Sequence, residues 1–317
     1  MKTINDDDFI AFVGRQESQY IIKPSELADD VVSRLAGETH HRGISLPWSK
    51  TRGKVALRPG EVSVWAGVNG HGKSALLGQV CAWALNTTWL IASMEMQPSA
   101  TMERMVKQVA GSRNPSQEFT RDFLAWTDNK LWLYDQIDTV KPERIIGMIH
   151  YAVKMLHVKH IVIDSLMKCG LATDDYNQQK DFVDRLCWAA KSTGVHIHLV
   201  HHVRKGERES HIPDKFDIRG ASEITDLVDN VFIVHRNKAK EEKIALGAEV
   251  DPESPDCVLK VAKQRHGEWE GAFHLWFCSE SKQFKPRPDD RPMAYWLYGT
   301  DARIDEERAA IQQEAML

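Results

Sequence analysis

The chain has 317 residues and a net charge of −4, and 42% of its residues are hydrophobic. This composition excludes an intrinsically disordered chain, and the length corresponds to one or two domains. The negative charge argues against a protein that coats duplex DNA by bulk attraction, so any nucleic-acid contact must come from a local basic feature. Five widely spaced cysteines without a C-x-x-C pair fit a reducing cytoplasm better than a disulfide scaffold or a zinc ribbon.

Residues 1–45 are interpreted as an N-terminal arm or linker, because they carry no sustained strand pattern. Within them Ser25–Leu35 (SELADDVVSRL) has the pattern of a short helix with Ser25 as its N-cap. We expect this helix to pack on something else, such as a second subunit, and the alternative is a helix folded back on its own core. The start MKTINDDDF is acidic and unlike a secretory signal, and no apolar run is long enough to span a membrane.

Residues 46–284 show strands that alternate with helices, which indicates an α/β domain with a mainly parallel sheet. The segments after 256 are typical of a hairpin-like end, and 285–317 is interpreted as a C-terminal tail with a helical pattern. The predicted strands are 62–66, 89–93, 131–135, 160–164, 195–200, 230–235, 257–264 and 272–277, and the clearest helices are 74–85, 143–156 and 178–191.

A phosphate-binding turn lies between the first of these strands and the helix that follows it. The residues match G-x-x-x-x-G-K-[ST], where glycines let backbone N–H groups approach phosphate oxygens and the helix N-terminus favours anions. In this pattern the lysine reaches the β- and γ-phosphates of a nucleoside triphosphate, and the hydroxyl is a ligand of Mg²⁺. The predicted nucleotide-binding residues are Gly67, Asn69, Gly70, Gly72, Lys73 and Ser74.

Two carboxylates follow later strands and point to the same edge of the sheet. Asp164 ends the apolar run HIVID and occupies the place of a Walker B acid that holds Mg²⁺. Glu95, in SMEM, follows the strand 89–93, which comes after the P-loop helix. There it is placed to accept a proton from the attacking water. From the residues alone, a surface glutamate at the start of a helix is an equal alternative for Glu95.

Five motifs in order resemble the RecA-like motor domain of DnaB-type hexameric replicative helicases, and most closely those of phage primase–helicases and of Twinkle. These motifs are SMEM (93–96), IVIDS (161–165), KSTGVHIHLVHHVRK (191–205), DIRGASEITDLVDNVFIVHRNK (217–238) and VAKQRHGEWEG (261–271). The resemblance covers about residues 45–280 and implies a RecA-like P-loop NTPase core. It also implies a homo-oligomer, a hexameric ring on single-stranded DNA that moves 5′ to 3′, fuelled by ATP or another NTP or dNTP with Mg²⁺.

The resemblance also implies catalytic roles beyond the P-loop. It supports Glu95 as the base and His202 as a polar sensor of the γ-phosphate. Arg236 matches an arginine at the subunit interface, and Lys263 and Arg265 match a K-x-R pair that acts on the neighbouring subunit's nucleotide. A metal site at the cluster of four histidines in 196–202 is the alternative interpretation of that stretch, but no carboxylate or thiol joins them at ligand spacing.

The polar segment 203–218 is long for a connection, which is typical of functional loops. The resemblance places it at the central pore of the ring, and the alternative is a solvated surface loop. The candidate DNA-binding residues are Arg204, Lys205, Arg208 and Lys215.

Nothing before Arg42 resembles a primase, so we expect a stand-alone motor with a separate primase and polymerase as partners and no membrane association. The expected location is the cytoplasm, that of a host if the chain is phage-encoded. Two other functions stay open: a filament-forming RecA-like recombinase or repair ATPase, and a nucleotide-switched loader or regulatory protein that unwinds nothing.

Overall fold

The computed structural model describes residues 21–36, 43–172, 175–203, 212–218 and 221–296, and the chain divides into a unit of residues 1–42 and a unit of residues 43–317. In the first unit a short 3₁₀ helix, η2 (Pro24–Leu27), continues into α2 (Ala28–Leu35). The helix was predicted, but its cap was not: Lys23 is the N-cap and Pro24 is the first helical residue, a position where proline needs no N–H partner. The large apolar side chains of this helix are all exposed: Leu27, Val31, Val32 and Leu35.

The second unit is built on a nine-stranded sheet in the order β11-β10-β9-β8-β3-β7-β6-β4-β5. The six strands from β8 to β5 in this order run parallel, and β9, β10 and β11 are antiparallel additions to one edge. The bounds are β3 (Val62–Gly67), β4 (Trp89–Ser93), β5 (Leu131–Leu133), β6 (His160–Asp164), β7 (His196–His202), β8 (Asn230–Arg236), β9 (Cys257–Gln264), β10 (Gly271–Phe277) and β11 (Phe284–Lys285). A separate two-stranded pair consists of β1 (Ile44–Ser45) and β2 (Ala56–Leu57).

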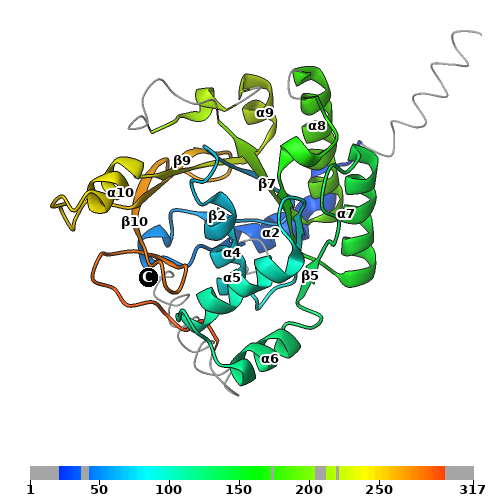
Figure 1. The fold of residues 1–317 in the computed structure, drawn as a ribbon. Coiled ribbons are helices and arrows are strands. Elements are labelled where there is room, and N and C mark those ends of the chain that lie inside the picture. Colours follow the sequence, from blue (N-terminus) through cyan, green and yellow to red (C-terminus); the bar gives the residue numbers. More distant parts are fainter. Residues whose placement is uncertain (1–20, 37–42, 173–174, 204–211, 219–220, 297–317) are drawn as a thin grey trace, which may run out of the picture. The chain divides into compact units, whose positions relative to one another are not determined.

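Helices cover both faces of the sheet, because successive side chains of the central strands enter different cores (Figure 1). Val64 and Ala66 of β3 face one core, whereas Trp65 faces the other. The first core also contains side chains of α7 (Pro142–Leu156), α8 (Tyr176–Thr193) and α9 (Ala221–Leu227), and the second contains side chains of α4 (Lys73–Trp83), α5 (Pro98–Ala110) and α6 (Gln117–Trp126). Because β3 is buried along its whole length, its sequence is a nearly continuous apolar run.

The residues that follow β11 pack on the second core up to the end of the described part. Tyr295 and Trp296 are buried, and the Tyr295 hydroxyl accepts a hydrogen bond from Gln79 Nε2 in α4 at 2.6 Å. The start of the segment interpreted as a tail therefore belongs to the domain, and its predicted helical part after Trp296 lies outside the described residues.

The eight predicted strands and the three clearest predicted helices are all present, and the α/β fold class is confirmed. The structure adds helices that the sequence analysis did not predict: α5, α6, α9 and α10 (Lys238–Ala245). Among the described residues no helix is both long and apolar enough to cross a membrane.

Candidate nucleotide-binding site

The P-loop is the turn from Gly67, the last residue of β3, to Lys73, the first residue of α4. Gly72 is the N-cap of α4 with a φ of 87°, a left-handed conformation that a side chain would strain. At Gly67 a Cβ atom would lie 2.4 Å from the carbonyl oxygen of Val234. Glycine at this position therefore lets β3 pass closely beside β8, which fixes where the loop begins.

The Lys73 ammonium group lies inside the turn. It donates hydrogen bonds to the carbonyl oxygens of Gly67 at 2.9 Å and Val68 at 3.1 Å, and it lies 3.3 Å from Nδ1 of His202. Burial lowers the pKa of Lys73 to about 8, and the nearby carboxylates of Asp164 and Glu95 oppose that shift. A buried cation surrounded by neutral acceptors is a strong attractor for phosphate.

Ser74 and Asp164 form the second feature of the site. Ser74 Oγ donates to Asp164 Oδ2 at 2.5 Å, and burial raises the pKa of the Asp164 carboxyl despite this bond. A hydroxyl and a carboxylate oxygen side by side fit Mg²⁺, which takes one or two protein oxygens and completes its shell with water and phosphate. The donor set therefore suits the predicted metal.

Glu95 lies beside this pair because β4 and β6 are neighbouring parallel strands, with Ser93 opposite Asp164. Ser165 Oγ donates a 2.8 Å hydrogen bond to Glu95 Oε1, so the residue after Asp164 orients the carboxylate. Glu95 is exposed at the mouth of the site. Its expected role as the base that acts on an attacking water stays a prediction.

These residues line a cavity of about 420 Å³, a volume suited to a small-molecule ligand. Among the lining residues that the sequence analysis missed, Arg104 is notable because its guanidinium is partly buried and contacts Met96 Sδ at 2.9 Å. No motif marked it, because the helix that carries it, α5, was not among the predicted elements. Other lining residues come from the C-terminal strands and their connections: Glu241, Asp256, Cys257, Phe277, Lys282 and Phe284.

Arg236 also lines this cavity, at the P-loop of its own chain. Its side chain pairs with Glu241 and donates to the Gly70 carbonyl at 3.2 Å, and its backbone N–H donates to His71 Nδ1 at 3.1 Å. Burial lowers the pKa of His71 to about 4, so this ring is a neutral acceptor. Arg236 therefore lies at the P-loop of its own chain, and its expected role at a subunit interface stays a prediction.

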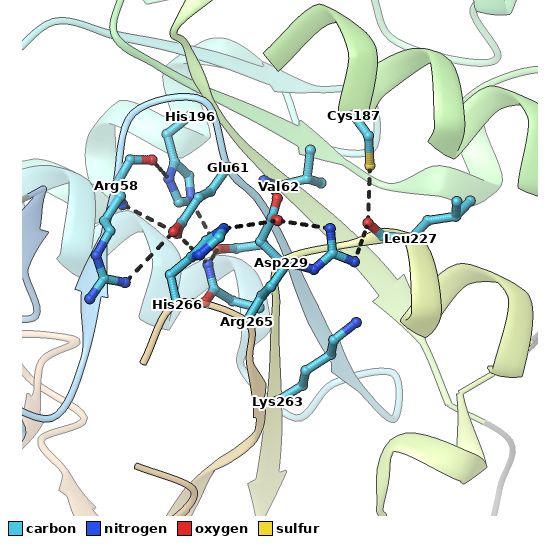
Figure 2. A network of polar contacts seen from close by, with 12 residues as sticks. Arg58, Glu61, Val62, Cys187, His196, Leu227, Asp229, Lys263, Arg265 and His266 are labelled. Atoms are coloured by element: carbon cyan, nitrogen blue, oxygen red, sulfur yellow. Dashed lines mark hydrogen bonds and ion pairs between the residues drawn. The ribbon is translucent and has the colours of Figure 1, made fainter. Parts of the chain in front are cut away.

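Lys263 and Arg265 do not line the cavity. In the antiparallel pair of β8 and β9, Arg236 at the P-loop end faces Cys257, and Asn230 at the other end faces Gln264. Six strand residues span roughly 20 Å. The K-x-R pair therefore lies at the ends of the strands that are opposite to the P-loop. Figure 2 shows the polar network at these ends, in which Arg265 contacts Asp229.

Three of the predicted DNA-binding residues, Arg204, Lys205 and Arg208, lie outside the described residues. Lys215 is half-buried in a short 3₁₀ helix, η5 (Lys215–Asp217), and its ammonium lies 5.6 Å from the ring centroid of Phe216. Phe216 is 73% exposed. An exposed aromatic ring beside a cation was not predicted at this position.

Comparisons with known proteins agree with this architecture. Residues 38–208 match a family described as AAA domain. The Twinkle homolog protein, chloroplastic/mitochondrial, of Arabidopsis thaliana is 21% identical over 220 residues, which are 63% of this chain and 31% of that protein. The chain thus spans about a third of the length of this curated relative.

Two solved structures share the fold, each with a TM-score of 0.69 and 15% identity. One is a DnaB-like replicative helicase described with its interactions with primase. The likeness covers 87% of this chain and 71% of that chain. The other is described as an ATPase domain. The likeness covers 83% of this chain and 98% of that chain. These likenesses confirm the RecA-like, DnaB-type fold expected from the motifs.

Proposed function

Because this chain belongs to the AAA domain family and has the fold of DnaB-type ATPase domains, we propose that it is an NTP-driven, ring-forming helicase that moves along single-stranded DNA during replication. The observation that carries the proposal is the cavity that joins a phosphate-binding lysine, a hydroxyl–carboxylate pair, a second carboxylate and an imidazole: Lys73, Ser74, Asp164, Glu95 and His202.

In this proposal the phosphates of ATP or another NTP replace the contacts that hold Lys73 within the turn. Ser74 and Asp164 would hold Mg²⁺, which would supply positive charge to neutralise the phosphate oxygens. Glu95, oriented by Ser165, accepts the proton of the attacking water. His202 lies between Lys73 and the segment that begins at Val203, so it is placed to report the loss of the γ-phosphate.

We assign the cations of this reaction to two subunits. Arg236 acts on the nucleotide of its own chain, because it lines that cavity. Lys263 and Arg265 lie too far from their own P-loop to reach it, which supports a role at the nucleotide of the neighbouring subunit. The exposed apolar stripe of α2 supports docking on another copy, since an isolated helix gains stability by burying such a face.

We place the DNA on the segment 203–218. The exposed Phe216 with Lys215 beside it is suited to a single strand, in which bases stack on aromatic rings and cations follow the backbone. Arg204, Lys205 and Arg208 are proposed as further contacts to phosphates. A separate primase and polymerase complete the proposed replication machinery in the cytoplasm, that of a host if the chain is phage-encoded.

Strand displacement on forked DNA tests this function. The wild-type protein with ATP and Mg²⁺ should open a fork with both tails and a fork without its 3′ tail, but not one without its 5′ tail. Glu95→Gln should bind nucleotide and DNA as the wild type does, yet hydrolyse and unwind at least about a hundredfold more slowly, because an amide cannot accept the proton.

The control for this experiment is Glu280→Gln, a neutralised carboxylate on the surface connection after β10, which should unwind normally. DNA-stimulated hydrolysis without strand displacement, together with filaments in electron microscopy, would indicate a recombinase-like ATPase instead. Hydrolysis indifferent to DNA would indicate a nucleotide-switched loader or regulator.

A further inference from the structure

Strand β9 presents a row of three cations to the chain segment that precedes β8. Lys260 Nζ pairs with Asp214 Oδ2 at 3.2 Å, just before the 3₁₀ helix η5. Lys263 and Arg265 follow along the same strand and its end, and both reach the end of α9. One strand therefore holds the segment 214–229 at both of its ends.

The last turn of α9 receives both distal cations. Lys263 Nζ donates to the carbonyl oxygens of Thr225 at 2.6 Å and Asp226 at 3.2 Å. Arg265 Nη2 donates to the carbonyl oxygens of Asp226 at 2.7 Å and Leu227 at 3.2 Å. The last carbonyls of a helix have no partner within it and carry the negative end of its dipole, so they suit cations. The K-x-R pair thus acts as a cap of α9.

Asp229 contacts the guanidinium of Arg265 from a second side (Figure 2). Its carboxylate is 2% exposed, and Oδ2 accepts a 2.9 Å hydrogen bond from the backbone N–H of Val62 at the start of β3. The other oxygen, Oδ1, lies 3.3 Å from Arg265 Nη1 and 3.9 Å from His266 Nε2. The hydrogen bond from Val62 in β3 fixes Oδ2 of Asp229. The other oxygen, Oδ1, therefore has a fixed position as a partner for Arg265.

We propose that Asp229 and the C-terminal turn of α9 are positioning groups for the cations that act in trans, so that α9 links the DNA segment to the neighbour's nucleotide. This inference rests on the proposed function, which assigns Lys263 and Arg265 to the neighbouring site. Asp229 itself touches no nucleotide and acts through Arg265. A shift of α9 moves the carbonyls that hold both cations, and α9 follows the segment 212–218 along the chain.

The decisive variant is Asp229→Asn. The amide oxygen can still accept the Val62 N–H, but the charge that faces Arg265 is lost. The matched control is Glu61→Gln, which neutralises a buried carboxylate one residue before Val62. Glu61 Oε2 accepts a hydrogen bond from Asn230 Nδ2 at 2.8 Å, and the carboxylate pairs with Arg58, so loss of its charge leaves the partners of Arg265 in place. Both variants remove a buried negative charge from the same network.

The test uses mixed oligomers. A Lys73→Ala chain cannot use its own P-loop but supplies a normal Arg265, and an Arg265→Ala chain supplies a normal P-loop. If sites form between chains, the mixture recovers hydrolysis that neither chain has alone. Asp229→Asn is then added to one chain at a time, and the DNA-stimulated rate and the KM for nucleotide are measured.

We expect Asp229→Asn in the Lys73→Ala chain to lower the recovered rate at least about tenfold with an unchanged KM, because a misplaced transition-state group affects turnover and not ground-state binding. In the Arg265→Ala chain it should have little effect, since the group that it positions is already absent. Glu61→Gln should have little effect in either chain.

Equal losses in both chains would mean that Asp229 only supports the local fold, and no loss in either would mean that Arg265 needs no orienting partner. Either result overturns this inference and leaves the proposed function in place. A mixture that never recovers activity would instead refute the arrangement in trans, and the positioning role of Asp229 with it.

Discussion

At the scale of single residues, Lys73 combines a structural and a chemical role. Its ammonium is held by the Gly67 and Val68 carbonyls, and burial lowers its pKa to about 8. Below that pH the group is charged before a phosphate arrives. Above it, binding must first restore the proton, so the affinity for nucleotide is linked to pH.

We therefore expect the dissociation constant for a non-hydrolysable nucleotide to rise by up to about tenfold per pH unit above pH 8, and to be nearly flat for this group between about pH 6.5 and 7.5. Calorimetry in two buffers of different ionisation enthalpy should show proton uptake at about pH 9. In Lys73→Arg the guanidinium stays charged throughout, so the pH dependence should be lost. The same slope in that variant would assign the titration to another group.

The sequence was enough to predict which residues lie together around the P-loop, because the spacing of these motifs fixes their geometry, and their binding of phosphate and metal stays a prediction. Lys73 and Ser74 are set by the turn and the helix, and Asp164 and Glu95 by the ends of neighbouring strands. It could not place Arg236, whose position depends on contacts with Gly70 and Glu241 in the folded chain. The roles of these residues in catalysis stay predictions.

At the scale of elements, the parallel strands carry a buried chain of histidines. Trp65 Nε1 donates to His198 Nδ1 at 3.2 Å, and so the proton of His198 lies on Nε2, which faces His160 Nδ1 at 3.2 Å. His196 is bonded to the Arg58 carbonyl at 2.6 Å and to Ser63 Oγ at 2.8 Å. Burial lowers the pKa of all three imidazoles, that of His196 to about 4.

These neutral imidazoles predict sensitivity to acid. The unfolded chain binds more protons below about pH 6.5 than the folded one, so stability is full above that pH and is lost as the pH falls toward about 4. In His196→Gln the loss of unfolding free energy between about pH 6.5 and 4.5, measured with urea, should be smaller by about 2 kcal/mol. Exposed His274→Gln should match the wild type. An equal loss of unfolding free energy in the wild type, His196→Gln and His274→Gln would refute the assignment of this acid sensitivity to His196.

Elements with a clear periodic pattern were predicted, and the missed ones bury little or carry mixed signals. Helix α10 has no buried residue, so hydrophobic spacing could not reveal it. Helix α6 buries only Phe123, and its best signal was the cap of Ser116, whose Oγ accepts from the Phe119 N–H at 3.0 Å. The nine-strand order was beyond reach from patterns alone, because it depends on pairings between distant segments.

At the scale of the whole molecule, the proposed active site is complete only between chains. Hydrolysis per mole of protein should then fall on dilution, with a midpoint that coincides with loss of the oligomer in mass photometry. Val31→Asp or Val32→Asp on the exposed stripe of α2 should move that midpoint to higher concentration, because a charge opposes burial of the stripe.

The control for the dilution experiment is Asp29→Lys, which changes an exposed position away from the apolar stripe and should leave the midpoint where it is. Constant specific activity down to concentrations at which only monomers are detected would contradict the assembly of sites between chains.

The central place of β3 governs how the domain emerges from the ribosome. Both sheet neighbours of β3, namely β7 and β8, follow it by more than a hundred residues. At typical translation rates this delay is on the order of ten seconds. During that time both edges of a largely apolar strand are unpaired, and such edges are prone to aggregation. The strand that leads into the P-loop is thus a site at which a chaperone could shield the nascent chain.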